Sequence, residues 1–92
     1  MRTFKLQIVT PEGMFYDGDC TQVTVKSTEG GVSIMAGHIP YVTTLADNGW
    51  CRVYTEAGKR SAACSGGMLT VTRDLTRIVA ASFKWELSLI HI

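Results

Sequence analysis

The stretch FKLQIVTPEGMFYDG, residues 4–18, carries the pattern that decides the fold. Phe4, Leu6 and Ile8 alternate with polar residues, so one face of an extended strand is apolar and the other faces water. The triplet Pro11-Glu12-Gly13 then supplies residue types that favour a turn. This sequence predicts a half-buried strand that ends in a reversal of the chain.

The same alternation recurs along the chain. Val23 and Val25 flank a threonine. In the stretch 50–55, Trp50, Arg52 and Tyr54 alternate with Cys51, Val53 and Thr55. No stretch of comparable length shows helical periodicity. Turn signals separate the apolar runs at 11–13, 17–18, 29–31, 47–49, 57–58, 65–67 and 73–74. Short strands at this spacing predict an all-β sandwich or barrel.

Three of these signals predict specific connections. Asn48-Gly49 favours a type I′ turn, which predicts a hairpin that joins YVTTLA (41–46) to WCRVYTE (50–56). A second hairpin is expected to close at residues 56–59. Ser65-Gly66-Gly67 predicts a tight connection between two strands, because glycine accepts positive φ.

Composition limits the class of protein. The chain has 92 residues, 46% of them hydrophobic and 18% charged, which fits one folded domain. The net charge of +1 comes with no basic stripe, so nucleic acid is not expected as a partner. No apolar run approaches the ~20 residues of a membrane span, and the N-terminus lacks a signal-peptide pattern. The three widely spaced cysteines fit neither a zinc site nor a disulfide framework.

The sequence gives little support for a catalytic site. The glycines of TEGGVSIMAGHIP (28–40) lack the lysine and helix of a phosphate-binding loop. Cys64 or Ser65 could act as a nucleophile with His38 as base and Glu29 or Asp17 to orient it, but no local motif supports this arrangement. We therefore expect no catalytic residue, no metal site and no cofactor.

His38 has two interpretations that the residues alone leave open. It lies between Gly37 and Ile39-Pro40, where its imidazole could hydrogen-bond the backbone of a turn. It could equally be an exposed contact for a partner protein.

Several motifs occur in a characteristic order: 4–13 (FKLQIVTPEG), Phe15-x-x-Gly18, Thr28-Glu29-Gly30, Ile34-x-x-Gly37-His38-x-Pro40 and Ser65-Gly66-Gly67-x-Leu69-x-Val71. This set closely resembles the N-terminal domain of the epsilon subunit of F-type ATP synthase, over about residues 3–86. The resemblance implies a β-sandwich of about ten short strands in two mostly antiparallel sheets.

The same resemblance implies a rotor role without an active site. Members of this family lie on the central stalk, where they bind the gamma subunit and the c-ring and help couple proton translocation to ATP synthesis. It also implies a peripheral position in the F1 sector at the cytoplasmic face of the bacterial plasma membrane. No transmembrane segment and no obligate homo-oligomer are expected.

Individual residues can be carried over from the family's motifs. Thr10, His38 and Thr43 match positions on the gamma-facing side, which favours the partner-contact interpretation of His38. Glu29, Gly30 and Gly31 match the loop near the c-ring. The family often has a second acidic residue at the position of Gly31, so an electrostatic contact with the ring is weaker here. Ala36 replaces a proline that is usual before Gly37-His38, which leaves Met35 less restricted.

The C-terminal end departs from the family, whose members continue into two helices that can restrain ATP hydrolysis and in some bacteria bind ATP. We expect residues 1–86 to form the sandwich domain and residues 87–92 (LSLIHI) to be a non-native tail. CTG TCT CTT ATA CAC ATC would encode that tail, and this DNA resembles a transposon end used in sequencing libraries. The alternative is a natural apolar tail that adds an edge strand.

A second hypothesis for function is a stand-alone β-sandwich that binds a ligand or a protein. It requires a concave face lined with exposed aromatic side chains, for which Tyr41, Trp50 and Tyr54 are the candidates.

Overall fold

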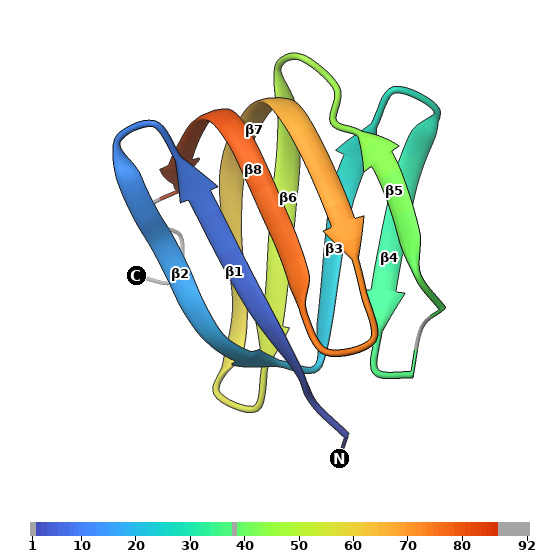
Figure 1. Ribbon diagram of the computed structural model, residues 1–92. Helices are drawn as coiled ribbons and strands as arrows, with labels where there is room; N and C mark the ends of the chain where they lie inside the picture. Colours follow the sequence, from blue (N-terminus) through green and yellow to red (C-terminus); the bar gives the residue numbers. More distant parts are fainter. Residues whose placement is uncertain (1, 38, 87–92) are drawn as a thin grey trace.

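The computed structural model describes residues 2–37 and 39–86. Both His38 and the tail 87–92 lie outside this described part, as does Met1. The described chain forms eight strands (Figure 1): β1 Phe4–Thr10, β2 Gly13–Cys20, β3 Gln22–Ser27, β4 Gly30–Met35, β5 Tyr41–Thr44, β6 Gly49–Thr55, β7 Gly58–Val71 and β8 Thr76–Trp85.

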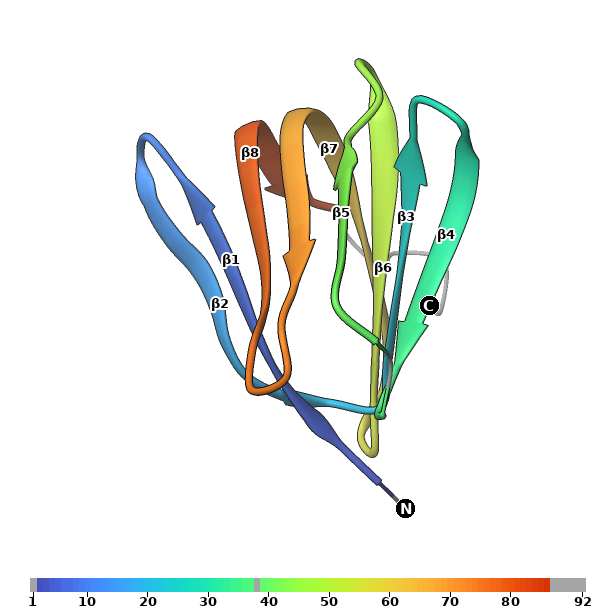
Figure 2. The ribbon, with the colours of Figure 1, turned by 45° about the vertical axis from the view of Figure 1, so that its right-hand side comes forward.

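The strands form a sandwich of two layers that share two long strands. The hydrogen-bonded order is β2-β1-β8-β7-β6-β3-β4, with β5 paired to β7. We define sheet A as β2, β1, residues 76–80 of β8, residues 68–71 of β7, and β5. Sheet B consists of residues 82–85 of β8, residues 58–64 of β7, β6, β3 and β4. Figure 2 shows the two layers from the side.

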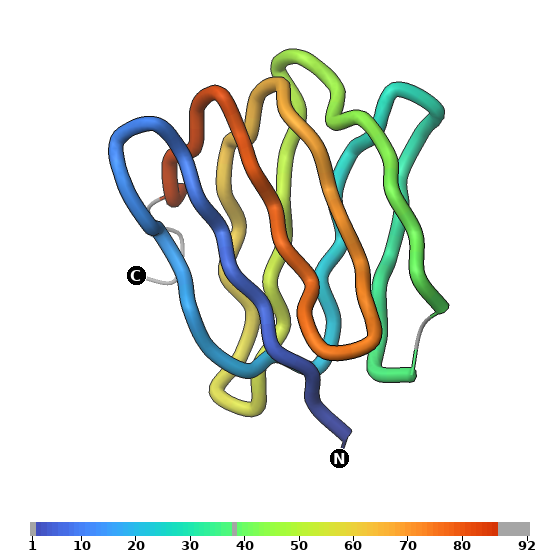
Figure 3. The backbone as a smooth tube through the Cα atoms, in the orientation of Figure 1, coloured from blue at the N-terminus to red at the C-terminus, as the bar shows by residue number. Residues whose placement is uncertain are grey.

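The all-β sandwich predicted from the sequence is confirmed, and its sheets are mostly antiparallel. The pair of β1 with β8 is parallel. The described residues contain eight strands because β7 and β8 run through the bend between the layers (Figure 3) without a break. Each contributes one half to sheet A and the other half to sheet B, so each sheet has five strand segments.

The predicted connection at Ser65-Gly66-Gly67 is wrong, because these residues lie inside β7 where it bends from sheet B into sheet A. Gly66 and Gly67 do have positive φ, 65° and 105°. A Cβ at Gly67 would collide with the carbonyl oxygen of Val79 and lie 2.8 Å from the Cα of Ala80. Glycine is required here because two backbones approach closely, as well as for its φ.

The predicted hairpin across Asn48-Gly49 is also wrong. β5 pairs with β7, whereas β6 pairs with β3 and β7, so the turn carries the chain from sheet A to sheet B. Asn48 has a φ of 54°, but Gly49 does not have positive φ, and a type I′ turn needs both. The backbone of this segment is held by other elements: the amide of Leu45 donates to the carbonyl of Gly67, and the amide of Gly66 donates to that of Ala46.

The β1–β2, β3–β4 and β6–β7 hairpins have loops of two residues and share one turn motif, a Ser or Thr followed three residues later by Gly. In the β1–β2 turn the Thr10 hydroxyl donates to the Gly13 carbonyl (3.3 Å) and accepts from the Glu12 amide (3.1 Å). The same pair of bonds forms in the β3–β4 and β6–β7 turns, around the hydroxyls of Ser27 and Thr55. The glycines have φ of 134°, 124° and 135°. The predicted hairpin at residues 56–59 is therefore confirmed, whereas the turn signal Asp17-Gly18 lies inside β2.

The core fills the space between the two sheets, and aromatic rings close one side of it. The rings of Phe15 and Phe83 lie 5.3 Å apart, those of Phe83 and Trp85 5.0 Å, and those of Tyr16 and Trp85 6.3 Å. The Arg60 guanidinium covers the Trp85 ring at 3.9 Å. These rings join β2, an edge of sheet A, to β8 at an edge of sheet B. The largest fully buried apolar side chains are those of Leu6, Ile8, Ile34, Leu69, Ile78, Val23, Val25 and Val53.

The close approach at Gly67 predicts a severe effect of any side chain there. Gly67→Ala should lower the free energy of unfolding by about 3 kcal/mol or more, because the methyl group must displace the backbone of β8. Gly31→Ala is the matched control, since its Cβ would make an ordinary 3.7 Å contact with Trp50. Urea unfolding followed by circular dichroism measures both, and a Gly67→Ala protein as stable as Gly31→Ala would contradict the prediction.

Candidate functional site

The outer face of sheet A carries a continuous row of exposed apolar side chains. The strand registers place Met14 beside Val9, Val9 beside Val79 and Val79 beside Met68. Met14, Val79 and Met68 are 53%, 46% and 47% exposed. Val42, on β5, is 56% exposed on the same face. We call these five residues the apolar strip.

The strand periodicity explains why these side chains point outward. On β1 the buried side chains are Leu6, Ile8 and Thr10, so Val9 points to the opposite side. On β8, Val79 lies between the buried Ile78 and Ala80. Sheet A is therefore apolar on both faces along this row, whereas a sheet that faces only water would be polar outside. Apolar surface of this kind, continuous across four strands, is typical of a protein interface.

Two of the three residues assigned to the gamma-facing side by resemblance have described positions, and both turn toward the interior. Thr10 is buried, and its hydroxyl is engaged in its own turn. Thr43 is half-buried and pairs with the core residue Leu69, while Val42 alternates to the outer face. His38 lies outside the described residues. The sequence reasoning missed the apolar strip, although adjacent apolar pairs such as Ile8-Val9 could have indicated it.

The residues assigned to the c-ring contact lie at one end of the sandwich. Glu29 occupies the tip of the β3–β4 turn with an exposed side chain, Gly30 begins β4, and Gly31 is exposed. The β1–β2 and β5–β6 turns lie at the same end (Figures 1 and 2) and carry Glu12 and Asp47, both exposed. Three exposed carboxylates thus lie on separate turns at this end, although Gly31 supplies none.

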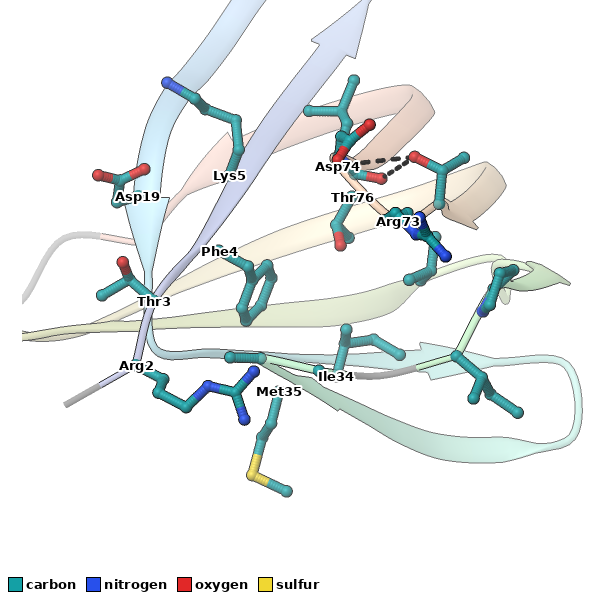
Figure 4. A pocket seen from close by; sticks show the side chains of 17 residues that line it. Arg2, Thr3, Phe4, Lys5, Asp19, Ile34, Met35, Arg73, Asp74 and Thr76 are labelled. Atoms are coloured by element: carbon teal, nitrogen blue, oxygen red, sulfur yellow. Dashed lines mark hydrogen bonds between the residues drawn. The ribbon is translucent and has the colours of Figure 1, made fainter.

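A groove of about 680 Å³ lies at the opposite end, where the N-terminal segment meets the β7–β8 turn and the segment after β4. Figure 4 shows Arg2, Lys5 and Arg73 around it together with Asp19 and Asp74. The Thr72 hydroxyl donates to the carbonyl of Leu75 and closes the β7–β8 turn. The groove therefore combines charges of both signs with an apolar floor, and no pair of its side chains forms a nucleophile with a base.

The cysteines do not form a catalytic site. Cys20, Cys51 and Cys64 are buried and free. Burial raises the pKa of the Cys64 thiol to about 11 and that of Cys20 to about 12, and it also raises the pKa of Cys51. A thiol with a raised pKa stays protonated at neutral pH and is a poor nucleophile. The hypothesis of a Cys64 nucleophile is therefore contradicted by the environment of that thiol.

The three aromatic residues considered for a ligand face lie apart. Tyr41 packs against the core from sheet A, whereas Trp50 and Tyr54 lie on β6 of sheet B. The Arg52 guanidinium lies 4.6 Å from the centre of the Trp50 ring. Trp50 and Tyr54 share the outer face of β6, and among the described residues Tyr41 does not join them there, so the three side chains form no common aromatic face.

Within residues 2–37 and 39–86, no three His, Cys, Asp or Glu side chains are grouped so that they could hold a metal ion. The same residues form no helix long and apolar enough to cross a membrane.

The fold defines a β-sandwich domain, and one of its sheets carries a row of apolar side chains on its outer face. The family described as "ATP synthase, Delta/Epsilon chain, beta-sandwich domain" matches residues 3–86. The chain belongs to this family.

Comparison with individual proteins agrees. The chain is 35% identical over 87 residues to the ATP synthase epsilon chain of Ruminococcus albus, covering 94% of this chain and 64% of that one. It is 41% identical over 80 residues to the epsilon chain of Bacillus velezensis, covering 87% and 60%. A chain in the structure of the Euglena gracilis mitochondrial ATP synthase, OSCP/F1/c-ring, has a TM-score of 0.83 at 21% identity, covering 97% and 58%. Our chain thus spans about three fifths of the length of these relatives.

The buried thiols predict a loss of stability at alkaline pH. An unfolded thiol ionises near pH 9, whereas Cys64 and Cys20 in the folded protein hold their protons until about pH 11 and 12. Because the unfolded state releases these protons first, stability should be independent of the thiols below pH 9 and should fall as the pH rises from 9 to 12. Each thiol contributes up to about 1.4 kcal/mol per pH unit.

Urea unfolding at a series of pH values measures this effect. Cys64→Ala should be less stable than the wild type at pH 7 but should lose stability less steeply between pH 9 and 11, because one titrating group is gone. Equal slopes for the two proteins would show that Cys64 does not have the raised pKa.

Proposed function

We propose that this domain is a central-stalk subunit of an F-type ATP synthase that binds the gamma subunit through the outer face of sheet A. The observation that carries the proposal is the apolar strip on the outer face of sheet A, where Met14, Val79, Met68 and Val42 are exposed and Val9 is half-buried between Met14 and Val79. Burial of such side chains on association contributes roughly 25 cal/mol per Å² of apolar surface. Membership of the family supports gamma as the partner.

Thr43 fits the same proposal as a residue at the border of this face. Its side chain is half-buried on β5, next to the exposed Val42. A bulky residue here would disturb both the inner packing and the edge of the interface. Thr10 acts in this proposal by fixing the β1–β2 turn next to Val9 and Met14, and His38 remains a proposed gamma contact.

The c-ring is the proposed partner of the acidic end. Glu29, Glu12 and Asp47 lie on three turns at that end of the sandwich, and together they can attract a basic loop on another protein. The bonds of Ser27 with the Glu29 amide and the Gly30 carbonyl hold the turn, so Glu29 is presented at a fixed position. In this arrangement the domain transmits rotation of the ring to the stalk and carries out no chemistry of its own. It lies at the cytoplasmic face of the bacterial plasma membrane as a peripheral part of the F1 sector.

Binding to a cognate gamma subunit tests the first contact. Met68→Glu and Val79→Glu should each weaken binding by about tenfold or more, because each places a charge at the centre of an apolar interface. Ala63→Glu is the matched control: Ala63 is an exposed residue of the same strand as Met68, but it lies in sheet B. Titration by biolayer interferometry compares the three.

Binding that is lost equally in Ala63→Glu would contradict the placement of the interface on sheet A. If the folded wild-type domain binds no gamma subunit, the stalk role itself is wrong. Thr43→Arg and His38→Ala in the same assay test the two contacts carried over from the family. Glu29→Lys should leave gamma binding unchanged and weaken association with purified c-ring.

A further inference from the structure

The outer face of sheet B has a different character from that of sheet A, because it is cationic. The strand segments of this sheet contain Lys26, Arg52, Lys59, Arg60 and Lys84 and not one Asp or Glu. Sheet A is mixed, with Asp17 and Asp19 on β2, Lys5 on β1 and Arg77 on β8. The positive charge of the strands is therefore concentrated in sheet B, whereas the acidic and basic residues of sheet A balance.

The cations are exposed and lack ionic partners. Lys26, Arg52, Lys59 and Lys84 are all exposed, and among the described residues none of the four forms an ion pair with a carboxylate. Arg60 differs, since its guanidinium is stacked on Trp85. Exposed like charges on one face repel each other, so the face as a whole favours a partner of opposite charge.

Trp50 lies within this group of cations. The registers align Trp50, Ala63 and Lys84 in one row, and Lys26 follows the last β3–β6 pair, Val25 with Cys51, on the side of Trp50 away from Ala63. Since neighbouring strands lie about 5 Å apart, Lys26 is ~5 Å from Trp50 at the backbone and Lys84 is ~10 Å away on its other side. Arg52 stacks on the indole ring at 4.6 Å.

Small residues leave the Trp50 ring accessible. Gly31 lies directly beside it, as a Cβ at Gly31 would be 3.7 Å from the ring, and Ala63 is its partner on β7. Below this row, Thr24 is hydrogen-bonded to Ser33 (2.9 Å) and to Gln22 (3.1 Å), so the neighbouring surface is a flat set of short polar side chains. Trp50 is thus an apolar contact beside positive charge on a face that also carries Tyr54 and the exposed side chain of Met35.

We infer that the outer face of sheet B is a docking surface for an acidic segment of a partner protein, one in which an apolar residue is flanked by carboxylates. The apolar residue contacts Trp50 between Gly31 and Ala63, and the carboxylates pair with Lys26, Lys84 and Arg52. Charge complementarity selects this occupant. The surface lies on the side of the sandwich opposite to the apolar strip, so its occupation does not compete with a partner on sheet A.

Binding of synthetic peptides to the whole chain tests the inference. The probe is a fluorescein-labelled peptide with the repeat Glu-Glu-Leu, and fluorescence anisotropy reports its binding. The double variant Lys26→Glu/Lys84→Glu should bind it at least about tenfold more weakly than the wild type. The double variant Lys5→Glu/Arg77→Glu, which makes the same change of charge on the outer face of sheet A, should bind as the wild type does. Added salt should weaken the wild-type complex.

A second peptide, with the repeat Glu-Glu-Ser, tests the apolar contact. The wild type should bind it several-fold more weakly than the leucine peptide, and Trp50→Ala should abolish this difference. Circular dichroism establishes that each variant is folded.

Three outcomes would overturn the inference: no binding of the leucine peptide by the wild type, equal weakening by Lys5→Glu/Arg77→Glu, or binding only to phosphatidylglycerol vesicles. None of them bears on the gamma subunit, because Lys26→Glu/Lys84→Glu should bind gamma normally and Met68→Glu should bind the peptide normally. The experiments therefore distinguish failure of the docking proposal for sheet B from failure of the proposed binding to gamma.

Discussion

The backbone contact between Gly67 of β7 and the Val79–Ala80 segment of β8 is the constraint on which the sandwich depends. Both strands bend at this point, and they can remain hydrogen-bonded through the bend only because no side chain separates them. The two sheets are therefore continuous along two strands, and the core is closed at this end by backbone instead of by a loop. Gly66 and the segment around Leu45 add hydrogen bonds at the same corner.

A sandwich made in this way presents two outer faces with different chemistry. Sheet A exposes apolar side chains in register across four strands, and sheet B exposes lysines and arginines around one indole ring. The inner faces are alike, since both supply aliphatic side chains to one core. The difference between the outer faces costs the fold little, because exposed positions of a strand contribute much less to stability than buried ones. Each face can therefore serve a separate partner.

Much of the fold followed from local sequence patterns. The alternation at Phe4, Leu6 and Ile8 predicted β1 correctly, since it depends on burial of one face, and the hairpin at residues 56–59 was correct because a local turn determines it. The errors arose where contacts between residues far apart in the sequence determine the strand pairing. Asn48-Gly49 has the residue types of a hairpin turn, but β5 pairs with β7 in sheet A, whereas β6 lies in sheet B. The glycines at 66 and 67 have the composition of a loop, yet β8 on one side and the segment at Leu45 on the other keep them within a strand.

The candidate site was less accessible to sequence reasoning. A resemblance assigns residues to a side of the molecule, but it gives no orientation, and Thr10 and Thr43 turn inward. The apolar strip becomes visible only when four strands are placed in register, because Met14, Val9, Val79 and Met68 are far apart in the sequence. Apolar residues on both faces of a strand are the available signal, but a strand that is buried on both faces shows the same pattern.

The shared turn motif has a consequence for how such a domain can change over time. In the three hairpins with two-residue loops, the opening hydroxyl donates to the carbonyl of the closing glycine, and the second residue of the loop contributes its backbone amide. The intervening positions, among them Glu12 and Glu29, are thereby released from structural selection. Their charge can drift to suit a changing partner while the scaffold stays constant, so recognition and folding can evolve as nearly independent traits.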